Sequence, residues 1–80
     1  MTSHFDYHYH QFKQAGKKLS EELDPKDFQR WDDIREAART AIALQAGIID
    51  TIPHDGRLKG AALRATQLLI RRYELADIAA

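Results

Sequence analysis

Residues 24–52 have the sequence DPKDFQRWDDIREAARTAIALQAGIIDTI, which predicts one long helix. Asp24 suits the N-cap, and Pro25 suits the first helical position, where its missing N–H leaves no hydrogen bond unmade. Pro53 is expected to end the helix, because the residue before a proline is pushed out of the α region. When the residues are projected on a helix, they form a broad apolar face, which predicts a central helix with at least two neighbours.

Two further helices are predicted on either side of this one, so that the whole chain, 1–80, forms a single domain with helices over about 4–23, 25–52 and 56–78. In the first helix, apolar residues alternate spacings of four and three, which is typical of a narrow helix–helix seam. The linker Pro53–Gly56 has strong turn chemistry, and Asp55 is available to cap the third helix.

The predicted fold class is all-α, with a long antiparallel helical hairpin plus an N-terminal helix in a three-helix bundle. The hairpin is expected between the central and third helices, because short links favour antiparallel neighbours. Helices of this length predict an elongated molecule. A single copy would bury the apolar faces of such helices poorly. A homodimeric bundle is therefore expected.

The third predicted helix is apolar on both sides, which is typical of a helix packed between two neighbours. Its main face is the larger one and contains Leu58, Ala61, Ala62, Ala65, Leu68, Leu69, Tyr73, Leu75 and Ala76. The other side carries Leu63, Ile70 and Ile78. We expect the main face to pack on the central helix. The second set then meets either the N-terminal helix or another molecule.

Size and charge also favour association. The chain has 80 residues and no cysteine, so neither disulfides nor thiolate metal ligands can stabilise it. Twelve basic and twelve acidic residues give a net charge of zero, and near-neutral chains tend to associate. The predicted protein-binding site consists of Leu63, Ile70, Tyr73 and Ile78, and the partner is a second copy or an unidentified protein.

An arginine stripe offers an alternative function. Arg57, Arg64 and Arg71 recur every seven residues, so they lie along one side of the third helix, where they could contact phosphates. They could instead be a solvated flank that pairs with acids of the central helix or with water. The zero net charge and the lack of a helix-turn-helix signature favour the flank. A small dimeric DNA-binding regulator is therefore the second interpretation.

The sequence predicts no catalytic, metal or cofactor site. It has no glycine-rich phosphate loop and no cysteine nucleophile. His4 and His8 have the i, i+4 spacing of metal ligands, but without an HExxH motif or further ligands we expect no metal. No apolar run is long enough to span a bilayer, and the first residues do not resemble a signal peptide, so a cytoplasmic location is expected.

These observations together predict a small non-enzymatic protein-binding module. Its role would be that of an adaptor, a regulator or an inhibitor of a larger partner. An accessory subunit that stabilises a larger complex is a third interpretation.

Overall fold

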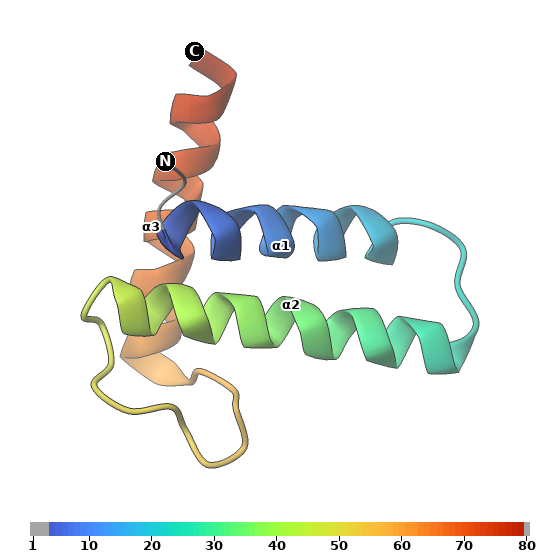
Figure 1. The fold of residues 1–80 in the computed structure, drawn as a ribbon, viewed down its shortest axis with the longest axis horizontal. Coiled ribbons are helices and arrows are strands. Elements are labelled where there is room, and N and C mark those ends of the chain that lie inside the picture. The colour runs from blue at the N-terminus through green and yellow to red at the C-terminus, as the bar shows by residue number, and fades with distance from the viewer. Residues whose placement is uncertain (1–3, 80) are drawn as a thin grey trace.

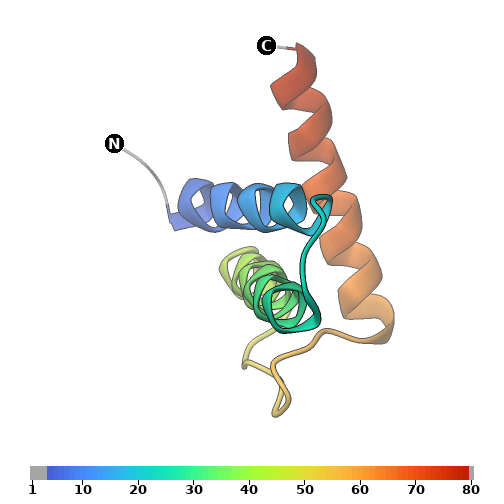
Figure 2. The same cartoon turned by 90° about the vertical axis from the view of Figure 1, so that its right-hand side faces the viewer.

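A computed structural model describes residues 4–79, which form three helices and no strand. They are α1 (His4–Leu19), α2 (Pro25–Gln45) and α3 (Gly60–Ala79). α1 and α2 lie side by side as an antiparallel hairpin, and α3 crosses one face of that hairpin (Figures 1 and 2). The all-α prediction is confirmed. α2 is also the central element, since it packs against α1, α3 and the following loop.

The hairpin forms because a short link joins two helices with small residues between them. Asp24 is the N-cap of α2 and accepts a hydrogen bond from the Asp27 N–H at 2.9 Å, while Pro25 is the first helical residue, as predicted. Ala15, Ala38 and Ile42 are buried in the hairpin core. Alanine at two of these positions lets the helix backbones approach closely.

The hairpin therefore joins α1 to α2, and the predicted hairpin between the central and third helices is wrong. The reason is that α2 ends at Gln45, well before the predicted end near residue 52. Gly47 adopts a left-handed conformation with φ of 75°, and its N–H bonds the Leu44 carbonyl. The Ile48 N–H bonds the Ala43 carbonyl at 2.9 Å, which completes a Schellman motif. Residues 46–59 then form a long loop between α2 and α3. A loop of this length does not force the two helices to lie antiparallel.

This loop is attached to α2. Thr40 Oγ1 lies 2.8 Å from the Gly56 carbonyl and 2.9 Å from the Glu36 carbonyl. The Arg57 guanidinium lies 3.3 Å from a carboxylate oxygen of Asp32, and Leu58 is buried. Residues 56–58 are thus held against the helix, and α3 begins only at Gly60 rather than near residue 56.

α3 contacts the hairpin with one face. Tyr73 stacks on Phe5 of α1 with ring centroids 4.1 Å apart, and Lys13 Nζ lies 2.6 Å from Asp77 Oδ2. The residues span 35 × 34 × 24 Å, so the shape is not elongated as predicted. The molecule is not elongated because α3 runs across the hairpin instead of alongside it (Figure 1).

Candidate functional site

The two faces of α3 have opposite environments. The face toward the hairpin carries Thr66 and Ile70, both buried, and Leu63, which is half-buried. Thr66 tolerates burial because its hydroxyl donates a hydrogen bond to the Ala62 carbonyl at 2.8 Å. The opposite face is exposed along the whole helix. The exposed face is therefore where α3 can meet another molecule.

That exposed face carries a row of residues that we call the outer strip. Its members alternate spacings of four and three, as in one seam of a coiled coil. They are Ala61, Ala65, Leu68, Arg72, Leu75 and Ala79, and all six are exposed. Leu68 is 65 % exposed and Leu75 is 56 % exposed. An apolar row of this kind is the usual anchor of helix-mediated protein binding.

A shallow groove extends the outer strip toward the end of α2. The groove has a volume of about 470 Å³, and Ile48 and Ala46 line it together with Leu68, Leu69 and Leu75. The first residues of the long loop therefore enlarge the apolar surface of α3. A partner that covers the strip would also contact Ile48.

The structure divides the four residues that were predicted to bind a protein. Ile70 is 4 % exposed and Leu63 is half-buried, so both pack within the monomer. Tyr73 is held by its stacking on Phe5, although part of its surface stays exposed. Ile78 is 82 % exposed near the end of α3. Exposed apolar surface was predicted on the side of α3 that carries Leu63 and Ile70. The structure places most of it on the main face instead.

The predicted arginine stripe is also divided. Arg57 lies in the loop before α3 and contacts carboxylates of both Asp32 and Asp33 at 3.3 Å. The hydrogen bond to Asp32 raises the pKa of Arg57 above its ordinary value. Asp55 receives a hydrogen bond from Lys59, which lowers its pKa, as does the Arg57 backbone N–H. Arg57 therefore has a structural role in holding the loop.

The other arginines of α3 are exposed and have no such role. Arg64 and Arg71 flank the outer strip, and Arg72 lies within it. None of the three has an ion pair with any residue in the range 4–79. The outer strip therefore combines apolar contact area with an unneutralised positive charge.

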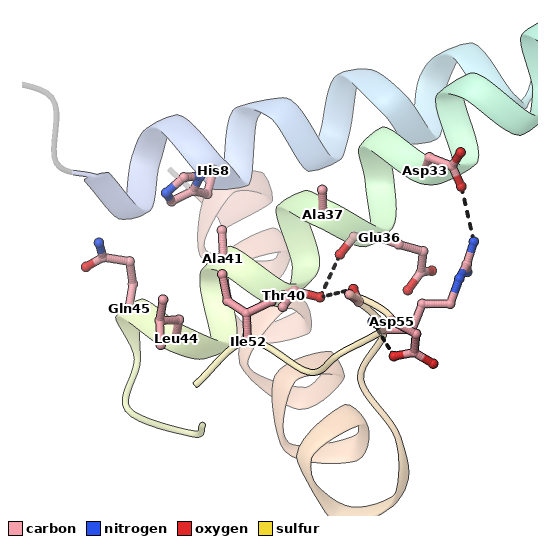
Figure 3. Close-up of a pocket in the computed structure, with 12 residues that line it drawn as sticks. His8, Asp33, Glu36, Ala37, Thr40, Ala41, Leu44, Gln45, Ile52 and Asp55 are labelled. Atoms are coloured by element: carbon pink, nitrogen blue, oxygen red, sulfur yellow. Dashed lines mark hydrogen bonds and ion pairs between the residues drawn. The ribbon is translucent and has the colours of Figure 1, made fainter. Parts of the chain in front are cut away.

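A second concave surface, which we call the hairpin groove, lies on the side of α2 away from α3. Its volume is about 480 Å³, and residues of α1, α2 and the long loop line it. Ala37 and Ala41 form the floor, and Leu44 and Ile52 supply larger apolar side chains. Figure 3 looks into this groove and shows α3 passing behind α2.

The polar side chains of the hairpin groove are at its two ends. His8 and Gln45 lie at one end, and Asp33, Glu36 and Asp55 lie at the other (Figure 3). The separation leaves an apolar floor between them.

Each of the three acids already has a basic neighbour. Glu36 pairs with Arg39 at 2.8 Å, and Asp55 pairs with Lys59 at 2.8 Å. Asp33 contacts Arg57, yet its side chain is still 61 % exposed. Asp33 is thus the acid of the groove that is most open to a further cation.

The described lining of the hairpin groove contains few chemically reactive groups. Thr40 is the one hydroxyl among its described lining residues, and two backbone carbonyls already surround that oxygen. His8 lies at the opposite end from the carboxylates, so no acid–base pair is assembled there (Figure 3). The non-enzymatic role stays a prediction.

Residues 4–79 contain no group of three or more His, Asp or Glu side chains that could hold a metal ion. The side chain of His4, from the histidine pair noted in the sequence, lies outside the described part of the structure. None of the three described helices combines the length and apolarity needed to cross a bilayer. Comparison with known proteins found no matching family model, no similar curated protein and no similar solved structure.

Proposed function

We propose that this protein is a protein-binding module whose contact surface is the outer strip of α3. The observation that supports the proposal is the row of exposed apolar side chains centred on Leu68 and Leu75. A partner helix or groove that covers this row would complete the packing of α3, which has a neighbour on only one side. Recognition of this kind needs no cofactor.

A few exposed apolar side chains supply the free energy for binding. Burying Leu68 and Leu75 contributes roughly 1.5–3 kcal/mol for each side chain. The loss of translational and rotational freedom on association offsets part of this gain. These two leucines can therefore anchor a specific complex when the polar rim is also matched.

The role of such a module is that of an adaptor, a regulator or an inhibitor of the protein it binds. An accessory subunit that stabilises a larger complex would use the same surface. All of these roles use the outer strip and differ only in the effect on the partner. The first experiment therefore asks whether the outer strip binds a protein.

Affinity capture from the native host tests the proposal. The wild-type protein is compared with a strip variant, Leu68→Lys with Leu75→Lys, and with a control, Gln67→Lys, which is also exposed on α3 but outside the strip. We expect a protein that is retained by the wild type and the control and lost with the strip variant. An identical set of captured proteins for all three would contradict the proposal.

DNA binding remains a second candidate because Arg64, Arg71 and Arg72 are exposed and form no ion pair within the described part of the chain. The apolar residues between them and the structural role of Arg57 favour protein binding instead. A mobility shift with duplex DNA that weakens with salt and disappears in Arg64→Ala with Arg71→Ala would support the DNA-binding function. Lack of binding at low ionic strength would reject it.

A further inference from the structure

We propose that the outer strip of one copy docks into the hairpin groove of a second copy, in a head-to-tail arrangement. This inference rests on the proposed function, because it takes the outer strip as a protein-binding surface. It also assigns an occupant to the hairpin groove.

The two surfaces match in length and relief. Leu68 and Leu75 are seven residues apart, which is about 10.5 Å along a helix. Ala37 and Leu44, at the two ends of the groove's apolar part, are separated by the same number of residues. The small side chains of Ala37 and Ala41 leave room for a helix to approach the floor closely. A parallel register places Leu68 of one copy over Ala37 of the other, and Leu75 over Leu44.

The charges match in that same register. Arg64 precedes Leu68 by four residues, and Asp33 precedes Ala37 by four residues, so Arg64 of one copy lies at the level of Asp33 of the other. Asp33 is exposed enough to accept this contact. Arg64 thereby meets the end of the groove where the acids gather. Complementary charges of this kind direct the orientation of docking.

The same charges disfavour a symmetric contact between two outer strips. Arg72 lies within the strip, and Arg64 and Arg71 flank it. Pairing two strips would therefore bring arginines of both copies together without acids between them. Juxtaposed like charges in an interface are costly.

The positions of the two surfaces fix the type of assembly. The hairpin groove lies on the side of α2 away from α3, so α3 cannot fill the groove of its own chain (Figure 3). The proposed contact is heterologous, because different surfaces of the two copies meet. Each copy offers its strip to one neighbour and its groove to another, so copies add head to tail.

Mixing two variants tests this arrangement. The strip variant, Leu68→Lys with Leu75→Lys, keeps an intact groove. A groove variant, Ala37→Lys with Leu44→Lys, keeps an intact strip, and all four substituted positions are exposed in the monomer. Each variant alone should self-associate about a hundredfold more weakly than the wild type, because lysine replaces the central apolar contacts. An equimolar mixture should form a one-to-one heterodimer through the single intact strip–groove contact.

Sedimentation velocity across micromolar to millimolar protein, with circular dichroism to verify folding, measures these states. The Gln67→Lys control should associate like the wild type, and the single variant Ala37→Lys replaces the groove variant if the latter is unfolded. A groove variant that still dimerises would overturn the inference in favour of strip-to-strip pairing. A mixture that stays monomeric would also overturn it. If the wild type is monomeric while capture of another protein depends on Leu68 and Leu75, this inference fails and the proposed function stands.

Discussion

Thr40 is the residue that connects α2 to the long loop. Its hydroxyl lies between the carbonyls of Glu36 and Gly56, and its side chain is buried. The contact with Glu36 lies within the helix, whereas the contact with Gly56 joins segments far apart in sequence. A partly buried carbonyl that loses its donor carries a desolvation penalty, so removal of this one hydroxyl should weaken the attachment of the loop.

Replacing Thr40 by valine should lower the free energy of unfolding by about 1–3 kcal/mol, because it leaves the partly buried Gly56 carbonyl without its hydrogen-bond donor. Chemical denaturation measures this change. Thr40→Ser, which retains the hydroxyl, is the control and should lose less. Equal stabilities for the valine and wild-type proteins would show that the hydroxyl does not hold the loop.

Asp55 makes the loop sensitive to acid. Its pKa is below the ordinary value of 3.8, because the carboxylate accepts hydrogen bonds from Lys59 and from the Arg57 backbone N–H. A lowered folded-state pKa means that the contact contributes stability above the unfolded pKa and loses it as the pH falls through the folded value. An NMR titration of the Arg57 amide should therefore give a midpoint below 3.8. A midpoint at or above that value would contradict this prediction.

At the level of helices, α3 shows what periodicity predicts and what it leaves open. The sequence shows correctly that both sides of α3 are apolar, but not which side is buried. The side with more apolar residues was expected to pack, yet the structure buries the side of Thr66 and Ile70. Thr66 satisfies its hydroxyl on its own helix, so a polar residue can face the core at little cost.

The two sides of α3 should respond differently to truncation. Ile70→Ala creates a cavity in the core and should lower the free energy of unfolding by about 2–5 kcal/mol. Leu68→Ala, on the outer strip, should change it by less than about 1 kcal/mol. Thermal or chemical unfolding of the two variants at a concentration where the protein is monomeric distinguishes them. Similar losses would mean that Leu68 is also buried in solution.

Helix ends were predictable where local chemistry was decisive. Asp24 and Pro25 begin α2 as expected, because capping depends on adjacent residues. The end of α2 was misplaced because Gly47 was counted as a helical residue, although it supplies the left-handed conformation of the helix terminus. The hairpin groove was not predictable, because Ile52 reaches α2 only after the loop folds back.

In the whole molecule, α3 is attached to the hairpin through a small set of contacts. Phe5 and Tyr73 stack near the start of α1, and Lys13 pairs with Asp77 at the surface. The hydrogen bond with Asp77 raises the pKa of Lys13, but exposed ion pairs of this kind contribute little and weaken with salt. The aromatic contact is therefore expected to be the main attachment of the second half of α3.

A double-mutant cycle with Phe5→Ala and Tyr73→Ala measures that attachment. The coupling energy between the two positions should be about 0.5–1.5 kcal/mol, as for other packed aromatic pairs. Hydrogen exchange of the amides of residues 71–79 should become faster in either single variant. Purely additive losses would show that the two rings do not hold α3 in place.

The antiparallel pairing of α1 with α2 through a short link also has a kinetic consequence. The link between α1 and α2 covers only residues 20–24, so formation of the hairpin needs little loop closure. Docking of α3 requires closure of the longer segment between residues 46 and 59 and should follow. We therefore expect Ala38 and Ile42 to control the rate of folding, while Ile70 mainly controls the rate at which the native protein unfolds.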